Sequence, residues 1–265
     1  MCNASKGRGL SHNVLDEYSR RAGTAVVSFV PGHRVGQAYP LLFAAACFAG
    51  LLWLGRQPSV RVEAGLLVLA GGVAGARLGF AALHLTYFSA HPIEITWLWQ
   101  GGLSWVGGAV GAVIGGVMAA TFTGTSPWDL ADALSVPTAI VALAAWTGCL
   151  VEACAFGRPV PGAVWAPAAY NSLGVLAPRW PTQALGMILS AVLLAALLRM
   201  GGRRPAGLVG AGTLAAVAAT NTILSLTRGD PSMLIGNLRV DTVAGLAVFV
   251  GAAGVATFRI RRTAG

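Results

Sequence analysis

The sequence predicts an all-α membrane protein with about seven transmembrane helices that pack through Gly-xxx-Gly faces. Of its 265 residues 55% are hydrophobic and only 10% are charged, whereas soluble domains carry about 25% charged residues. Apolar stretches with few charges recur along the chain, and their length of about 20 residues crosses a bilayer core of about 30 Å. Two of these stretches also repeat a glycine at every fourth position, a pattern typical of helices packed closely within membranes.

The predicted spans divide the chain into a membrane domain with a tail at each end. Residues 1–37 form a polar, basic N-terminal tail, residues 38–258 form the seven-span domain, and residues 259–265 form a basic C-terminal tail. A proline-rich loop at 159–182 is expected to leave the membrane, because proline interrupts helices. The spans cover residues 38–55, 65–84, 103–123, 133–154, 183–199, 206–226 and 239–258.

The two glycine stripes predict which helices pack together. Residues three and four apart share a helix face, so each stripe forms a face without side chains that another backbone can approach. We therefore expect the second and third spans to pack stripe to stripe. The stripes are Gly71, Gly75 and Gly79 in the second span and Gly107, Gly111 and Gly115 in the third.

Two ionisable residues fall inside apolar segments and need an explanation. Arg77 lies in the second span and Glu152 near the end of the fourth. An arginine at the centre of a membrane helix costs about 2.5 to 3.5 kcal/mol on insertion scales, so it normally faces the bundle interior or a wet cavity. We expect Arg77 to serve function or to form a buried ion pair, and Glu152 to be a structural counter-ion or a base.

Charge and cysteine content exclude several classes of function. The net charge is +9, and all but one of the 18 basic residues are arginines. They gather at segment ends, where they are expected to face lipid head groups rather than nucleic acid. The four cysteines have no paired metal spacing, so we expect neither disulfides nor zinc and interpret Cys149 and Cys154 as small apolar side chains. No cofactor fingerprint is found, so no organic cofactor or metal is expected.

The order of several motifs resembles the bacterial prolipoprotein diacylglyceryl transferases, a seven-span family of the inner membrane, over residues 36–258. The most specific motif is Trp-Gln-Gly-Gly-Leu-Ser-Trp-Val-Gly-Gly at 99–108. The other motifs, in chain order, are Tyr39, Gly-Ala-Arg-Leu-Gly-Phe at 75–80, His-Pro-Ile-Glu-Ile at 91–95, the segment from Gly148 to Pro159, Pro-Thr-Gln at 181–183 and Arg-Gly-Asp at 228–230.

The resemblance implies an activity, two partners and a set of site residues. Such enzymes move the diacylglyceryl group of phosphatidylglycerol, or of another anionic phospholipid, to a cysteine thiol in the lipobox of a prolipoprotein signal segment. Arg77, Arg158 and Arg228 would bind the lipid phosphate, although Arg158 and Arg228 also stand at span ends where arginines commonly snorkel. The catalytic candidates are Arg77, Glu152 and Arg158, and the positioning candidates are Tyr39, Gly107, Gly108 and Gly148.

Three positions depart from the pattern of that family. Val106 replaces a histidine, Trp146 a catalytic arginine, and Asn221 a second arginine. Valine and tryptophan cannot donate a charge-assisted hydrogen bond to a phosphate. An alternative is therefore a relative that binds anionic lipid or a lipoprotein signal segment without transfer. A small transporter is less favoured, because the two halves show no corresponding broken segments.

Orientation follows from the distribution of arginines. An odd number of spans places the two termini on opposite sides of a bacterial cytoplasmic membrane. Arginines directly abut the span ends at 199–204 and 259–262. By the positive-inside rule, this places the C-terminus in the cytoplasm and the N-terminus outside.

Overall fold

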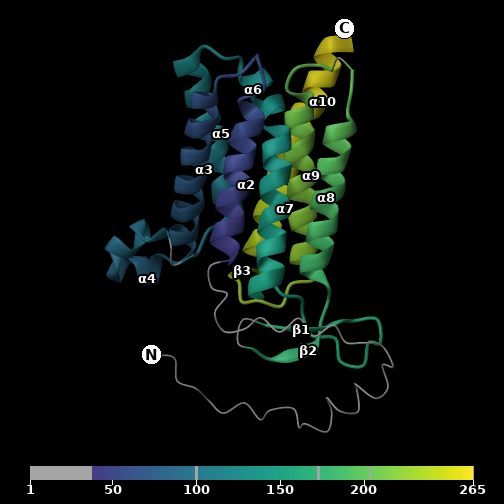
Figure 1. The fold of residues 1–265 in the computed structure, drawn as a ribbon. Coiled ribbons are helices and arrows are strands. Elements are labelled where there is room, and N and C mark those ends of the chain that lie inside the picture. The colour runs from purple at the N-terminus through teal and green to yellow at the C-terminus, as the bar shows by residue number, and fades with distance from the viewer. Residues whose placement is uncertain (1–37, 99–100, 172–173, 203, 265) are drawn as a thin grey trace.

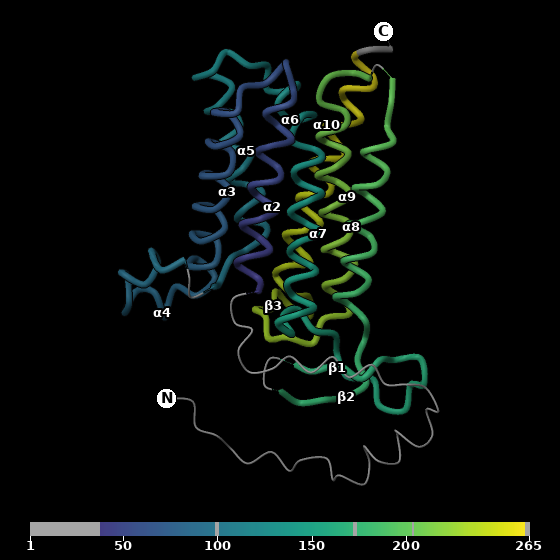
Figure 2. Tube along the Cα trace, viewed as in Figure 1, coloured from purple at the N-terminus to yellow at the C-terminus, as the bar shows by residue number. Residues whose placement is uncertain are grey.

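The computed structural model describes residues 38–98, 101–171, 174–202 and 204–264, so the predicted N-terminal tail lies outside the described residues. The described chain forms a bundle of long helices that run along a common direction (Figure 1). The start of α2 and the end of α10 lie at opposite ends of this bundle (Figure 2). An odd number of crossings between these two points explains that placement.

The long helices agree with the predicted spans to within a few residues, apart from α10, which extends further. They are α2 (Ala38–Leu54), α3 (Val62–Leu83), α5 (Trp105–Thr123), α7 (Ser135–Glu152), α8 (Thr182–Arg199), α9 (Leu208–Ser225) and α10 (Val240–Ala264). Within the described residues, six are long and apolar enough to cross a membrane, and α2 is apolar with 17 residues. Large apolar side chains point outward from several of them, including Phe48, Ile114 and Val192. A surface of this kind suits lipid rather than water.

Short elements connect these helices. At one end of the bundle, α4 (Leu85–Ala90) and the 3₁₀ helix η1 (Pro92–Thr96) follow α3, and α6 (Pro127–Ala133) lies at the other end (Figure 1). The proline-rich loop contains the antiparallel pair β1 (Ala168–Tyr170) and β2 (Leu176–Pro178), in which Ala169 faces Ala177. A second hairpin, β3 (Leu234–Ile235) with β4 (Leu238–Arg239), leads into α10.

The predicted contact between the glycine stripes of α3 and α5 is confirmed. A Cβ atom added at Gly71 would lie 2.5 Å from the carbonyl oxygen of Gly111 and 3.1 Å from the Cα of Gly115. Gly75 and Gly79 meet the backbone of Gly107 in the same way. The two backbones therefore touch directly, as small residues permit in membrane helix pairs.

Two helix starts are capped by side chains, one from the residue next to the helix and one from a distant element. The Ser104 hydroxyl accepts a hydrogen bond from the Gly107 N–H at the start of α5 (3.2 Å). At the opposite end of the bundle, the Asp132 carboxylate of α6 accepts the N–H groups of Gly207 (2.7 Å) and Gly210 (2.8 Å). These are free N–H groups at the start of α9, so Asp132 caps a helix that begins 76 positions later.

Candidate functional site

The beginning of α2 docks on the end of α7, which brings together three residues that the sequence identifies. Gly148 is buried, and an added Cβ there would lie 2.7 Å from Cδ2 and 3.2 Å from Cα of Tyr39. The Tyr39 N–H donates to the Glu152 Oε1 (2.8 Å). Because the first N–H groups of a helix lack intrahelical partners, Glu152 satisfies one at the start of α2. Its partner is therefore a backbone N–H rather than a cation.

A disulfide joins Cys149, in the last turn of α7, to Cys154, just beyond the end of that helix. The prediction that neither cysteine forms a disulfide was therefore wrong. The physical reason is that α7 ends at Glu152, and Ala153 takes a left-handed conformation with φ 54°. That turn folds the chain back and brings the two Cα atoms to 4.5 Å. A separation of five residues would not allow this bond on a continuous straight helix, whose rise is about 1.5 Å per residue.

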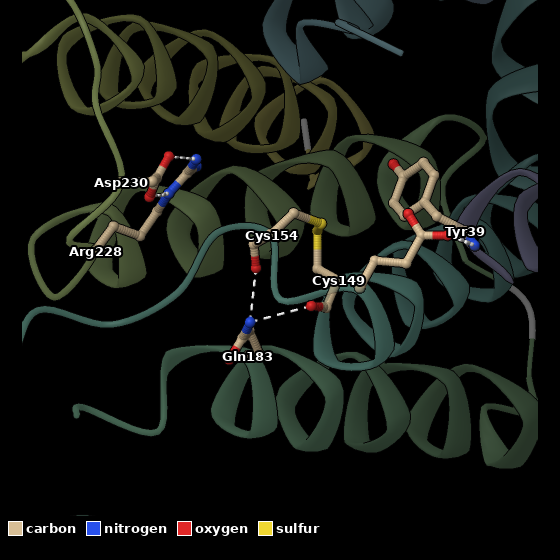
Figure 3. Close-up of a disulfide and its surroundings, with 7 residues drawn as sticks. Tyr39, Cys149, Cys154, Gln183, Arg228 and Asp230 are labelled. Carbon is tan, nitrogen blue, oxygen red and sulfur yellow. Dashed lines mark hydrogen bonds and ion pairs between the residues drawn. A yellow bond between two sulfur atoms is a disulfide. The ribbon is translucent and has the colours of Figure 1, made fainter. Parts of the chain in front are cut away.

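Gln183 at the start of α8 joins this turn from a third helix. Its Nε2 donates to the carbonyl oxygens of Cys149 (3.0 Å) and Cys154 (2.7 Å), as Figure 3 shows. The Cys149 carbonyl also accepts the N–H groups of Ala153 and Cys154, which close the end of α7, so Gln183 adds a side-chain donor from α8 to this helix end. The cystine turn, which we define as residues 148–155, thus holds α2, α7 and α8 together at one end of the bundle.

Arg158 follows the cystine turn and carries the exposed cation of this end. Its backbone pairs with two segments, since its N–H donates to the Thr227 carbonyl (2.9 Å) and its own carbonyl accepts the Trp180 N–H (3.1 Å). Its guanidinium carbon lies 5.9 Å from the Trp180 ring centroid. The Arg158 side chain is exposed and forms no hydrogen bond or ion pair with another described residue. It is therefore available to an anionic group.

Arg228 is brought close to Arg158, but carboxylates surround it. The segments around the two residues pair through Gly157 and Arg228. The Arg228 guanidinium binds the Asp230 carboxylate in a bidentate manner (Figure 3) and lies 3.7 Å from the Asp241 carboxylate. Arg239 completes a network of two cations and two anions, 3.2 Å from Asp230. Burial alone would raise the pKa of Asp230, but its bonds to Arg228 and the charge of Arg239 lower it below the ordinary value.

Arg77 lies apart from these residues, in the last turns of α3, and its exposed fraction is 4%. Its guanidinium donates to four backbone carbonyl oxygens of the segment that joins α3 to α5. These belong to Ile95 (2.8 Å), Gly102 (3.2 Å), Glu94 and Gly101. No carboxylate of a described residue forms an ion pair with it. The predicted buried ion pair is thus replaced by a set of carbonyl ligands, which stabilise a cation through dipoles.

The three departures from the family pattern have ordinary packing partners. Trp146 has an exposed fraction of 7%, and a Cβ added at Gly186 of α8 would lie 2.5 Å from its Cε2. Asn221 donates from Nδ2 to the Val217 carbonyl of its own helix (2.9 Å). Val106 is half-buried in the first turn of α5. A tryptophan thus fills the space between α7 and α8 at the position where the resemblance implies an arginine.

One functional arginine candidate was missed by the sequence reasoning. Arg179 has an exposed fraction of 5% and donates to the carbonyl oxygens of Ala169 (3.2 Å) and Gly157 (3.3 Å). Its burial lowers its pKa. It connects the β1–β2 pair to the segment that carries Arg158. Its only sequence signal is its position in a proline-rich loop, which does not separate it from a surface arginine.

Comparisons with known proteins agree with the motif order. The family described as prolipoprotein diacylglyceryl transferase matches residues 27–258. The chain is 28% identical over 232 residues to a phosphatidylglycerol–prolipoprotein diacylglyceryl transferase of Bordetella avium, covering 80% of this chain and 86% of the relative. It is 32% identical over 195 residues to a protein of that description from Methylocella silvestris, covering 69% and 68% of the two chains.

Proposed function

Because the chain belongs to the prolipoprotein diacylglyceryl transferase family, we propose that it moves the diacylglyceryl group of phosphatidylglycerol to a prolipoprotein cysteine thiol. The observation that carries this proposal is the family match over residues 27–258, which includes the first six long helices and most of α10. The relatives named for this reaction match most of the chain at 28% to 32% identity. The acceptor cysteine would lie in the lipobox of the signal segment.

The reaction sets clear requirements for the protein. The thiol sulfur attacks the glyceryl carbon that bears the phosphate, so that a C–S bond forms while the C–O bond breaks. The thiol loses its proton, and glycerol phosphate leaves with the electron pair of the broken bond. Fixed cations near the phosphate stabilise the charge that develops on this leaving group.

Among the candidate arginines, Arg158 meets this requirement best. Its guanidinium is exposed and unpaired among the described residues, whereas Arg228 faces two aspartates and Arg77 donates to four carbonyls. We assign the phosphate contact to Arg158. Tyr39, Gly148 and Glu152 would act as positioning residues, because they fix the start of α2 against the cystine turn beside it.

The orientation proposed here places the cystine turn and the N-terminus outside the cytoplasm, with the protein in the inner membrane. Disulfides form and persist in oxidising compartments and are rare in the cytosol. The Cys149–Cys154 disulfide therefore supports an external position for this end of the bundle. The positive-inside rule gives the same assignment, because Arg259, Arg261 and Arg262 lie at the other end.

The test is transfer by the purified full chain in lipid. Labelled phosphatidylglycerol and a lipobox peptide are supplied, and the labelled peptide is measured. We expect transfer by the unmodified chain and a loss of about 100-fold in Arg158→Gln, the effect of removing one preorganised donor. Arg56→Gln, at the other end of the bundle, is the matched control and should keep full activity. No transfer from a folded protein, while a family member succeeds in parallel, would refute the proposal.

A second candidate function is lipid or signal-segment binding without transfer, and Trp146 favours it. A buried indole occupies the position of a family arginine. If this candidate holds, the unmodified chain binds phosphatidylglycerol but transfers nothing, and the triple variant Val106→His, Trp146→Arg, Asn221→Arg gains activity. Transfer by the unmodified chain would eliminate this candidate.

A further inference from the structure

Two cavities meet at Arg77, at the end of the bundle where α4 lies beside the end of α3 (Figure 1). One has a volume of about 200 Å³ and is lined by polar and aromatic groups. The other, of about 360 Å³, is lined almost entirely by apolar side chains. Arg77 lines both, so it forms the boundary between a polar and an apolar compartment. A phospholipid has this same division between its headgroup and its acyl chains.

The apolar cavity is a groove along one face of α3. Ala70, Val73, Ala74 and Leu78 line it, and their spacing of three and four places them on one side of the helix, over a length of about 12 Å. The segment that follows α4 also lines it, through Ile95, Thr96 and Leu98. Ala70, Ala74 and Leu78 are exposed, so the groove opens sideways from a predicted membrane span. It is therefore open to an acyl chain.

The polar cavity contains a carboxylate among aromatic rings. Phe80, Tyr87 and Phe88 line it together with His84, and the Phe80 and Phe88 rings meet edge to face at 6.1 Å. The Glu94 Oε2 accepts the Tyr87 hydroxyl (2.7 Å), which fixes the carboxylate at the wall. No basic side chain of a described residue forms an ion pair with Glu94. The Arg77 guanidinium lies over the Phe80 and Phe88 rings, 5.9 and 5.3 Å from their centroids, so the Glu94 carboxylate is the group that attracts an organic ammonium.

Arg77 places a positive charge next to that carboxylate without neutralising it. Its guanidinium donates to the backbone carbonyl of Glu94, while the Glu94 side chain turns to Tyr87. The wall thus presents a buried cation beside the groove and an anion on the exposed side of the polar cavity. A zwitterionic headgroup, with a phosphate next to the acyl chains and an ammonium at its tip, has the complementary order of charges.

We propose that these two cavities bind a zwitterionic phospholipid, with its ammonium at Glu94, its phosphate beside the one N–H of the Arg77 guanidinium that donates to none of the four backbone carbonyls, and one acyl chain in the α3 groove. Phosphatidylethanolamine is the representative of this class. Phosphatidylglycerol has no ammonium and would leave the Glu94 carboxylate without a counter-charge. The site is therefore separate from the proposed donor site at Arg158 and has the opposite headgroup preference.

Native mass spectrometry of the delipidated full chain in detergent tests this proposal. Phosphatidylethanolamine and phosphatidylglycerol with identical acyl chains are titrated, and the occupancy of the first bound lipid is compared. We expect phosphatidylethanolamine to bind about tenfold more tightly, as one charge-assisted contact provides. Phosphatidylcholine, which keeps the ammonium, should also bind more tightly than phosphatidylglycerol.

Matched variants test whether the preference for phosphatidylethanolamine depends on Glu94 and on the α3 groove. Glu94→Gln keeps the shape of the side chain but removes its charge, so the preference for phosphatidylethanolamine should fall by about tenfold. Glu63→Gln removes a carboxylate from the other end of α3, where Glu63 is exposed and 3.6 Å from Arg61, and should change nothing. Ala74→Phe should weaken the binding of both lipids by filling the groove.

The outcome that overturns the proposal is equal or tighter binding of phosphatidylglycerol by the unmodified chain, a measurement that needs no variant. An equal loss of preference in Glu63→Gln and Glu94→Gln would also overturn it, because the effect would then follow net charge and not the cavity. The readout is lipid binding without any acceptor peptide. Failure of the transfer assay therefore leaves this test unaffected, and the reverse also holds.

Discussion

Adjacent glycines in α3 give a sharp prediction about the contact between α3 and α5. A Cβ added at Gly71 would lie 2.5 Å from the Gly111 carbonyl oxygen. Real Cβ atoms essentially never come closer than 3.0 Å to such an atom, so the two backbones must separate by at least about 0.5 Å. A Cβ added at Gly72 would meet only ordinary contacts at 3.6 Å, with Ala112 and the Gly108 carbonyl. The two substitutions are chemically identical and occupy neighbouring positions of one helix.

The magnitudes follow from two opposing effects. Glycine to alanine in a helix interior gains about 1 kcal/mol of helix propensity at both positions. Overpacking against a rigid backbone costs about 1 to 3 kcal/mol, and this cost applies at Gly71 alone. We therefore expect Gly71→Ala to be about 1 to 3 kcal/mol less stable than Gly72→Ala. In a chain of this size each kcal/mol corresponds to about 2 to 4 °C of unfolding temperature.

Thermal unfolding of the two variants in the same detergent measures this difference. Tryptophan fluorescence and the fraction that remains monodisperse after heating provide two independent readouts. We expect Gly72→Ala to unfold at or above the temperature of the unmodified protein and Gly71→Ala to unfold several degrees below Gly72→Ala. Equal unfolding temperatures, or a lower one for Gly72→Ala, would refute the stripe-to-stripe contact of α3 with α5.

Three further predictions concern residues at the end of the bundle that carries the cystine turn. Replacing Cys149 and Cys154 by serine, or adding a reductant, should lower stability by about 2 kcal/mol, because the closed loop is short; thermal unfolding with and without reductant measures it, and an unchanged midpoint would contradict it. The lowered pKa of Asp230 means that its ion pairs stabilise fully above about pH 4 and lose their contribution as the pH falls through the lower native pKa. Unfolding midpoints between about pH 2.5 and 6 should show this loss, and Asp230→Asn should remove that part of the pH dependence; an identical slope in the variant would exclude Asp230 as its source. Arg77→Lys should lower the free energy of unfolding by about 2 to 4 kcal/mol, because an ammonium cannot reach four carbonyls. The exposed control Arg61→Lys should leave the free energy of unfolding almost unchanged. A similar loss of stability in both variants would argue against the carbonyl ligands.

The sequence predicts the helices well because the bilayer restricts what a spanning segment can be. Backbone groups in lipid must be satisfied within the segment, so an apolar run of about 20 residues has essentially one solution. The glycine repeats also predict which faces meet, since each stripe is the face of its helix that another backbone can approach closely. The contact between the two stripes could thus be inferred from the sequence, whereas the register that places Gly71 against Gly111 could not.

The loops could not be predicted in the same way, because their contacts join residues far apart in the chain and follow no periodicity. The disulfide depends on where α7 ends, and a shift of one turn would separate Cys149 from Cys154. The carbonyl ligands of Arg77 come from a segment whose path is set by positive φ angles at Gly101 and Gly102. Hydropathy does not encode such turns. Asp132, which caps α9, is likewise indistinguishable in sequence from an ordinary loop aspartate.

The formation of the Cys149–Cys154 disulfide also reports when the fourth long helix is inserted during the biogenesis of the protein. In the proposed orientation, neither thiol can be oxidised until the end of α7 has crossed to the side where oxidants act, and Gln183 can bind the finished turn only after α8 has been synthesised. The bond therefore records that the fourth helix has been inserted in its final direction. In a pulse-labelled cell, the time at which this pair resists thiol alkylation would mark the moment at which half of the bundle is complete.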